Sequence, residues 1–88
     1  MAKLVLNYKP TFIRQLNRLV SDIEEEALEK ITLFSDPKKH TKLAVHKLHG
    51  KLEWYSSFSV NFKYRIVFKY LSKKEVVFLS IGDHEIYR

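Results

Sequence analysis

The sequence lacks cysteine altogether and has only two glycines and two prolines among its 88 residues. Without cysteine, neither a disulfide framework nor a thiolate metal site can form. There is also no glycine-rich phosphate loop, no Gly-x-Ser-x-Gly sequence and no helix-turn-helix signature. These absences argue against nucleotide-binding P-loop enzymes, α/β-hydrolases and the commonest class of DNA-binding domain.

Long apolar runs are missing as well, and residues 1–4 (MAKL) lack the apolar centre of a signal peptide. Yet 45% of the residues are hydrophobic, with six Phe, five Tyr and one Trp, which is enough for a packed core. No internal repeat, low-complexity tract or linker is visible. We therefore expect residues 1–88 to form a single domain of a soluble, cytoplasmic protein that has no contact with a membrane.

Acidic residues become scarce in the second half of the chain. Residues 1–37 contain five Lys/Arg and six Asp/Glu, whereas residues 38–88 contain eleven Lys/Arg and four Asp/Glu, a net charge of +7. A basic half of this kind suits a polyanion such as nucleic acid. A basic surface can also serve solubility alone, and the net charge does not distinguish nucleic-acid binding from solubility.

The first half of the chain has the pattern of one strand and two helices. Residues 3–8 alternate as in a short strand, and an amphipathic helix follows with Thr11 as its predicted N-cap. Ser21 and Glu24 have the spacing of a capping box that starts a second helix. Residues 35–37 (SDP) end that helix, because proline cannot continue it. Two helices joined this closely predict an antiparallel hairpin.

The second half predicts a sheet. Residues 38–51, with five Lys and three His, form a basic connector, and residues 54–60, 64–70 and 75–81 read as three strands with short turns between them. The predicted class is α+β in the order β-α-α-β-β-β, with the helical hairpin on one face of a small, mainly antiparallel sheet. The other face should be more open, and its predicted residues are Ser57, Ser59, Arg65, Val67 and Lys69.

Two residues of this sheet are chemically informative. Arg65 interrupts an apolar strand, so it either contacts an anion or pairs with Glu53, Glu75 or Glu85 at the surface. His84 follows Gly82 at a strand end, where an imidazole suits proton transfer but is also common on ordinary surfaces.

The remaining histidines do not form a metal motif. His40, His46 and His49 lack regular spacing and carboxylate neighbours, so we predict no metal and no cofactor. Tyr55 and Tyr87 either stack on bases or close the edge of the core. Such a set of residues suits RNA cleavage without metal: an imidazole accepts the 2′-hydroxyl proton, a second group protonates the leaving 5′-oxygen, and a cation stabilises the phosphate.

Four stretches in succession, at residues 46–52 (HKLHGKL), 54–56 (WYS), 64–68 (YRIVF) and 81–87 (IGDHEIY), resemble the bacterial RelE/ParE toxin superfamily. The resemblance covers nearly the whole chain and is nearest to the YafQ-like and YoeB-like toxins. It implies the RelE-like fold and a type II toxin of a toxin–antitoxin pair. Such a toxin is usually an mRNA interferase, an endoribonuclease that cuts mRNA in the ribosomal A site. A cognate protein antitoxin neutralises it in a hetero-oligomeric complex.

The resemblance also implies roles for particular residues. His46 would be the general base, His84 the general acid, Arg65 the phosphate ligand and Tyr87 the residue that orients the nucleotide. Weaker RNA contacts are expected from Lys47, His49, Lys51, Tyr55, Lys63 and Arg88.

The sequence departs from its nearest subgroups at four of these strand and connector positions. Ser57 and Ser59 stand where several active relatives carry a cation or a histidine. Lys63 replaces an acid of YafQ-like toxins, and His46 replaces a glutamate of YoeB-like toxins. Two alternatives follow: a ParE-like, non-catalytic inhibitor of DNA gyrase, and a toxin-derived protein with little activity. ParE-like chains generally lack the histidine set, so His46 with His84 favours RNA cleavage.

Overall fold

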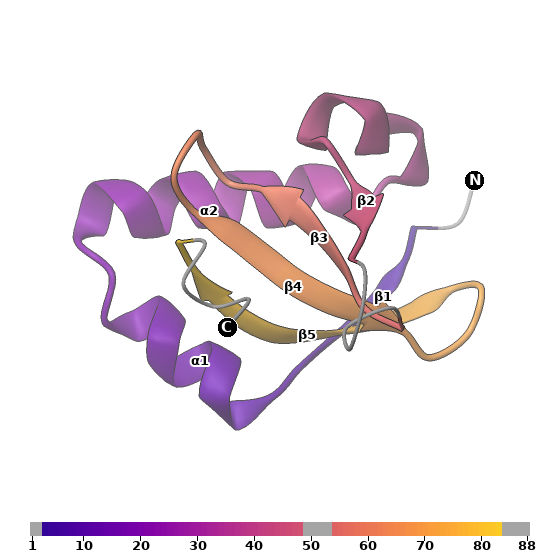
Figure 1. Cartoon of the computed structure of the whole chain (residues 1–88), viewed down its shortest axis with the longest axis horizontal. Helices are drawn as coiled ribbons and strands as arrows, with labels where there is room; N and C mark the ends of the chain where they lie inside the picture. Colours follow the sequence, from indigo (N-terminus) through magenta and orange to yellow (C-terminus); the bar gives the residue numbers. More distant parts are fainter. Residues whose placement is uncertain (1–2, 49–53, 84–88) are drawn as a thin grey trace.

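The computed structural model describes residues 3–48 and 54–83 (Figure 1). None of the helices in these ranges has the length and apolar character needed to cross a membrane. The elements follow in the order β1 (Val5–Tyr8), α1 (Pro10–Asn17), α2 (Ser21–Phe34), the 3₁₀ helix η1 (Pro37–Leu43), β2 (His46–Lys47), β3 (Ser56–Ser59), β4 (Arg65–Tyr70) and β5 (Glu75–Gly82).

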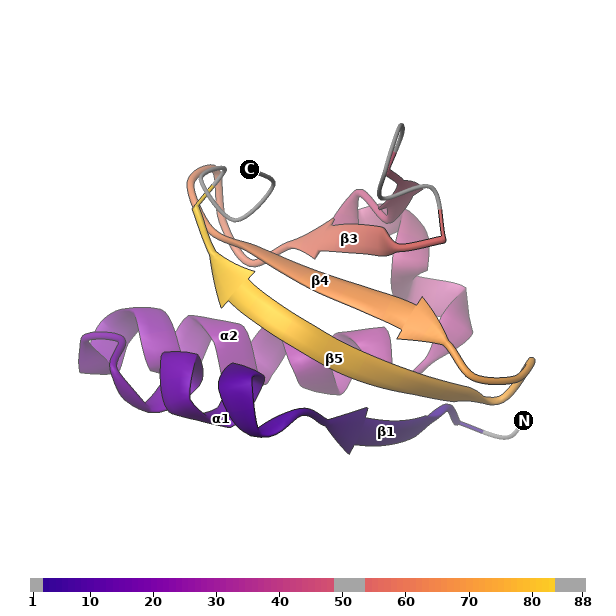
Figure 2. The ribbon, with the colours of Figure 1, turned by 60° about the horizontal axis from the view of Figure 1, so that its bottom comes forward.

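One five-stranded sheet contains all the described strands, in the spatial order β1-β5-β4-β3-β2. β1 pairs with β5 in parallel, and every other neighbouring pair is antiparallel. Helices α1 and α2 lie together against one face of this sheet (Figure 2). The predicted α+β class, the mainly antiparallel sheet and the helical layer on one face are confirmed.

Five phenylalanines form the centre of the core between the helices and the sheet. Each is fully buried, and Phe34 of α2 stacks on Phe58 of β3 with ring centroids 4.4 Å apart. Burying a Phe side chain contributes about 1.5–3 kcal/mol, and well-oriented aromatic pairs add about 0.5–1.5 kcal/mol. The alternation that the sequence shows in β3 and β4 is explained by this cluster, whose members are Phe12, Phe34, Phe58, Phe68 and Phe78.

The predicted basic connector is not a simple link, and this expectation was incomplete. Pro37 occupies the first turn of η1, and the Asp36 carboxylate caps that helix by accepting from the Lys38 amide at 3.1 Å. The same proline that ends α2 therefore begins another helix. After η1, residues His46–Lys47 form β2, which pairs with β3 and adds a strand that the sequence did not predict.

Both predicted N-caps are wrong. Lys9 precedes α1, with Pro10 at its first position, while Thr11 accepts from Arg14 at 3.3 Å instead of capping the helix. Val20 precedes α2, and the Glu24 amide donates to the Val20 carbonyl at 2.9 Å, so Ser21 lies inside the helix. Proline has its φ angle fixed near the helical value and lacks an amide proton, which explains why α1 starts there without a side-chain cap.

Two side chains tie the helices to the sheet. Gln15 of α1 accepts a hydrogen bond from the Ile81 amide of β5 at 2.9 Å, beyond the point where β1 stops pairing with β5. Glu26 of α2 accepts from the Asn61 side chain at 3.0 Å, at the β3–β4 turn. Because unpaired backbone groups at a sheet edge cost free energy, the Gln15 contact satisfies β5 where no strand covers it.

Candidate functional site

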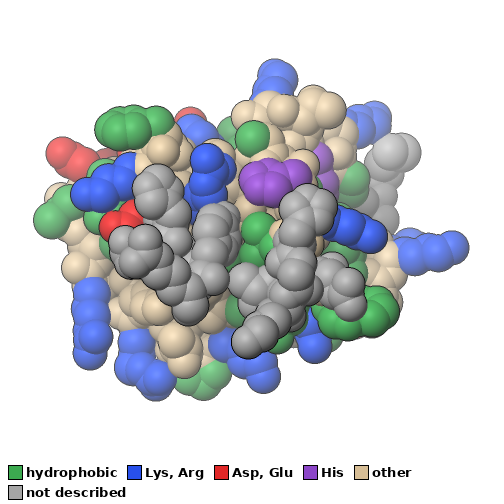
Figure 3. All heavy atoms as spheres, in the orientation of Figure 1, with side chains coloured by type: hydrophobic (Ala, Val, Ile, Leu, Met, Phe, Trp, Pro, Cys, Tyr) green, Lys and Arg blue, Asp and Glu red, His purple; other side chains and the backbone are tan. Residues whose placement is uncertain are grey.

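The candidate site lies on the sheet face that points away from α1 and α2. Pairing register places His46, Ser57, Val67 and Ser80 side by side across β2, β3, β4 and β5. Side chains alternate between faces along a strand, so these residues point opposite to Phe58 in the core. We call this set the histidine row. Figure 3 views this face and shows histidine side chains with Lys and Arg side chains on both sides.

Arg65 occupies a neighbouring row on the same face. It pairs in register with Ser59 on one side and Gly82 on the other, and its Nη1 donates to the Ser59 hydroxyl at 2.5 Å. Glu75, a predicted surface partner, lies at the opposite end of β5, where it accepts from the Asn7 side chain at 3.3 Å. The half-buried guanidinium is therefore held over the sheet by Ser59, two residues along β3 from Ser57.

The imidazole of His46 has a contact at each ring nitrogen. Nδ1 lies 2.9 Å from the Ala44 carbonyl, and Nε2 lies 3.4 Å from the Ser57 hydroxyl. A carbonyl oxygen can only accept, so Nδ1 must hold the proton in this contact. In the neutral ring Nε2 is then unprotonated and accepts from Ser57. This is the protonation state that a general base at Nε2 requires.

The backbone at Ala44 makes the first of these contacts possible. Ala44 has φ 53° and ψ 46°. Among the described non-glycine residues, it alone has a positive φ angle. This left-handed conformation costs on the order of 1 kcal/mol for alanine. It turns the chain from η1 into β2 and directs the Ala44 carbonyl at the imidazole two residues later. Strain of this size at a site-forming turn is consistent with a functional constraint.

Part of this face is buried, which corrects the expectation that Ser57 and Val67 are open to solvent. Ser57 is 0% exposed and Val67 is 5% exposed. Val77 and Leu48 are also buried, and all of these residues lie outside the main core cluster. His46 is exposed at the margin of this buried patch, and its Nε2 lies beside the hydroxyl of the fully buried Ser57.

The other predicted RNA contacts fall in different places. Lys47 is exposed beside His46 on β2, and the Leu48 amide donates to the Tyr55 carbonyl at 3.0 Å, so Tyr55 lies next to the same strand. Lys63 is in the β3–β4 turn, with Nζ 5.7 Å from the centroid of the Tyr64 ring. Lys47 thus follows His46 in the chain but points to the opposite sheet face, Tyr55 lies beside the end of β2, and Lys63 lies in the turn that precedes Arg65.

Half of the predicted site falls outside the described residues, namely His49, Lys51, His84, Tyr87 and Arg88. β5 ends at Gly82, in register with Arg65, and Asp83 is the last described residue of the chain. The roles assigned to these five residues therefore stay predictions.

His40 has a structural role instead of a place in the site. Its Nε2 lies 2.8 Å from the Phe34 carbonyl, and its ring stacks on Phe34 with centroids 4.4 Å apart. It therefore packs η1 onto the end of α2. Across residues 3–48 and 54–83, no three His, Cys, Asp or Glu side chains gather as a metal site would require.

No pattern in the sequence indicates that Ser57 and Ala44 orient His46. The sequence predicts Ser57 on the open sheet face, as a small residue where several active relatives carry a cation or a histidine, and it predicts no role for Ala44. Both roles depend on the pairing of β2 with β3, and a strand of two residues shows no periodicity.

Sequence comparison finds no relative: no protein-family model and no curated protein matches the chain. Comparison of structures finds chains of known structure that share the fold over nearly the whole length of this chain, at 15–21% identity.

A chain of the RelBE2 toxin–antitoxin complex from Mycobacterium tuberculosis matches with a TM-score of 0.75 at 20% identity, covering 94% of this chain and 93% of that one. A chain of the Escherichia coli DinJ–YafQ toxin–antitoxin complex gives 0.72 at 17% identity, covering 96% of both. The YoeB/ParE toxin from Agrobacterium tumefaciens gives 0.67 at 17% identity, covering 92% and 99%. The chain therefore has the RelE-like fold that the resemblance implied.

Proposed function

We propose that this protein is the toxin of a type II toxin–antitoxin pair and acts as a metal-independent endoribonuclease on mRNA in the ribosomal A site. The observation that supports cleavage most directly is the arrangement of His46, whose Nε2 is left as an acceptor on the sheet face that also presents Arg65. The RelE-like fold supports the same class of activity, since RelE and YafQ chains share it.

The proposed reaction needs one base, one acid and one cation. His46 Nε2 accepts the proton of the 2′-hydroxyl as the 2′-oxygen attacks the adjacent phosphorus. The bond from phosphorus to the 5′-oxygen breaks, leaving a 2′,3′-cyclic phosphate, and the 5′-oxygen takes a proton from the acid, for which we predict His84. The Arg65 guanidinium stabilises the negative charge on the phosphate as it grows. Tyr87 is predicted to orient the nucleotide.

We also propose that a protein antitoxin binds this toxin in the cytoplasm. Chains with this fold have been crystallised in toxin–antitoxin complexes, among them RelBE2 and DinJ–YafQ. The net charge of +7 over residues 38–88 calls for an acidic partner segment, which would fold as it covers the basic surface. Such a complex would be a hetero-oligomer.

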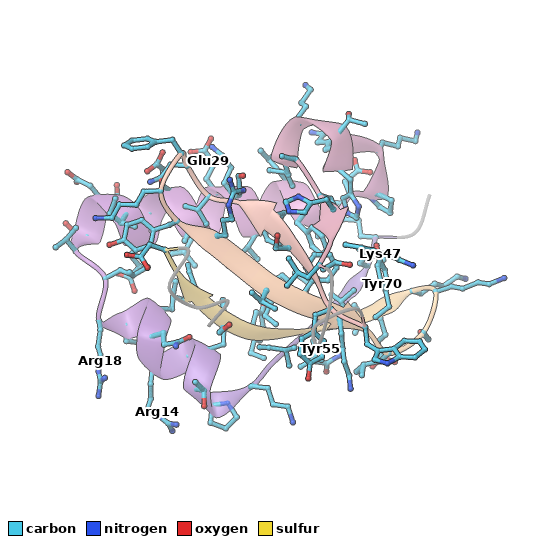
Figure 4. All side chains as sticks on the ribbon, in the orientation of Figure 1. Arg14, Arg18, Glu29, Lys47, Tyr55 and Tyr70 are labelled. Atoms are coloured by element: carbon cyan, nitrogen blue, oxygen red, sulfur yellow. The ribbon has the colours of Figure 1, made fainter. Side chains whose placement is uncertain are left out.

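Cleavage of a defined mRNA on programmed ribosomes tests the catalytic proposal. We expect His46→Ala and Arg65→Ala each to slow single-turnover cleavage by about 10²–10³-fold, the usual loss when a base or an electrostatic stabiliser is removed. Arg18→Ala is the matched control, because Arg18 is an exposed cation at the end of α1, away from the histidine row (Figure 4). Its cleavage rate should equal that of the wild type.

A DNA gyrase supercoiling assay on the same protein tests the ParE-like alternative. If the wild type cleaves no message but blocks supercoiling by purified DNA gyrase, the interferase proposal is wrong and the ParE-like function holds. If the wild type does neither, the chain is a toxin-derived protein that kept only the fold. Equal cleavage by wild type and His46→Ala would remove His46 from the mechanism while leaving the enzyme class intact.

A further inference from the structure

Aromatic and basic side chains gather at the end of the sheet formed by the β4–β5 hairpin and the start of β3. Trp54 is 82% exposed there and Tyr70 is 47% exposed, although both are large hydrophobic side chains. Lys47, Lys73 and Lys74 are exposed nearby. We call this set the aromatic–basic end, and its members are Lys47, Trp54, Tyr55, Tyr70, Lys73 and Lys74.

Strand pairing explains why these residues are neighbours. Ser56 and Phe68 form the last pair between β3 and β4 at this end of the sheet, and Trp54 and Tyr70 each lie two residues beyond that pair, so both leave the paired region at the same end. The Leu71 amide donates to the Glu75 carbonyl at 2.8 Å and closes the hairpin that presents Lys73 and Lys74 directly after Tyr70. Figure 4 shows Lys47, Tyr55 and Tyr70 together at this end of the sheet, far from Arg14 and Arg18.

The charge around these rings is mostly positive. Residues 38–74 contain ten Lys/Arg and a single acid, Glu53, and the next acid, Glu75, accepts a hydrogen bond from the Asn7 side chain at 3.3 Å. The Tyr70 ring is held in place by an edge contact with the buried Phe68, at 5.7 Å between centroids and an interplanar angle of 73°. A surface with oriented aromatic faces among cations matches the two requirements for binding single-stranded nucleic acid, base stacking and phosphate neutralisation.

We propose that the aromatic–basic end is a binding site for single-stranded RNA, distinct from the residues that perform cleavage. Bases stack on Trp54 and Tyr70, and Lys47, Lys73 and Lys74 contact the phosphates. The identity of the RNA as substrate rests on the proposed function. An acidic peptide would use the cations but has no need of exposed aromatic faces, and this favours RNA as the occupant.

Tyr55 connects this site to the histidine row. It directly precedes β3, and its carbonyl accepts from the amide of Leu48, the residue after β2, at 3.0 Å. This backbone segment joins the aromatic–basic end to Ser57 of the histidine row, so RNA bound at the aromatic–basic end passes Tyr55 on its way to His46 and Arg65. The site would fix which nucleotide arrives at the catalytic residues.

Trp54 is the only tryptophan of the chain, so its fluorescence reports directly on this site. The probe is a short, unstructured 2′-O-methyl oligoadenosine, which has no 2′-hydroxyl and cannot be cleaved. We expect saturable quenching of the wild-type protein by this oligonucleotide and no quenching by inorganic polyphosphate of the same charge. Quenching by polyphosphate alone would show that charge, not stacking, acts at this site and would overturn the proposal.

Substitutions test which residues of the aromatic–basic end bind RNA. The affinity of each variant for RNA is measured by fluorescence anisotropy of a labelled oligonucleotide. Trp54→Ala and Tyr70→Ala should each weaken binding by about tenfold, the loss expected for one stacked base. Phe62→Ala is the matched control, because Phe62 is 94% exposed at the β3–β4 turn, the other end of β4. The double variant Lys73→Gln/Lys74→Gln should reduce the slope of log affinity against log salt by about 1.4.

The outcomes separate this proposal from the proposed function. If Phe62→Ala weakens binding as much as Trp54→Ala, or if an acidic peptide quenches Trp54 where RNA does not, the RNA site is wrong. If ribosomal cleavage proceeds but Trp54→Ala leaves oligonucleotide affinity unchanged, only this proposal fails. If the oligonucleotide binds as expected while no message is cleaved, the proposed function fails and the RNA site stands.

Discussion

His46 and Ser57 are eleven residues apart in sequence and meet because β2 and β3 pair. The Ala44 carbonyl determines which ring nitrogen of His46 holds the proton, and the buried Ser57 hydroxyl occupies the other nitrogen. A histidine orientated at both nitrogens is better prepared for proton transfer than one that rotates freely. Ser57 is therefore a positioning residue in the proposed reaction, acting through His46.

The role of Ser57 can be separated from folding. We expect Ser57→Ala to slow single-turnover cleavage by about tenfold, the value of one ordinary hydrogen bond, while the affinity for RNA stays unchanged. Ser80→Ala is the control, since Ser80 lies in the same row on β5, two strands farther from His46. A fall in affinity without a fall in rate, or equal losses in both variants, would rule out positioning.

At the scale of elements, the β3–β4 turn is fixed to the helical layer through Asn61. Its Oδ1 accepts from the Lys63 and Tyr64 amides at 2.9 and 2.8 Å, and its Nδ2 donates to Glu26 of α2. One side chain therefore closes the turn that precedes Arg65 and connects it to a helix. The position of Arg65 over the sheet depends on this turn.

Removal of this side chain should destabilise the fold. We expect Asn61→Ala to lower the free energy of unfolding by about 2 kcal/mol, because the partly buried Tyr64 amide and the exposed Lys63 amide lose their acceptor and Glu26 loses its donor. Glu26→Gln keeps an acceptor for Asn61 and should cost under about 1 kcal/mol. Urea unfolding at pH 7 gives both values. Equal losses would show that the tie to α2, and not the turn, is what stabilises this region.

At the scale of the whole molecule, helices cover one sheet face, and the opposite face holds both the histidine row and Arg65. Residues 1–37, with a net charge of −1, form β1, α1 and α2, whereas residues 38–88, with a net charge of +7, form most of η1 and strands β2 to β5. The positive charge is thus concentrated in the half of the chain that builds most of the sheet, which suits a polyanion that approaches the sheet.

The stability of the whole molecule should fall at alkaline pH through Tyr70. Burial raises the pKa of the Tyr70 hydroxyl above its ordinary value of 10.0. The folded state then holds this proton at a pH where the unfolded state has released it. Stability from this group is fully present below pH 10 and is lost as the pH rises through the folded pKa.

Tyr70→Phe provides the test of this pH dependence. We expect the free energy of unfolding of the wild type to decrease more steeply above pH 10 than that of the variant, while the two curves run parallel at lower pH. Parallel curves throughout would show that Tyr70 ionises equally in both states. The variant keeps the aromatic ring, so it does not disturb the packing against Phe68.

The sequence by itself determined the class of fold, because alternation in the strands and 3.6-residue spacing in the helices are local properties. It also predicted Arg65 as a candidate, since a cation stands out in an apolar strand, whereas His46 became a candidate through the resemblance to RelE/ParE toxins. Only the tertiary structure decided the existence of β2, the proton position on His46 and the burial of Ser57. These depend on pairing between segments far apart in the chain, and hydrogen bonds across strands have no signature within either one.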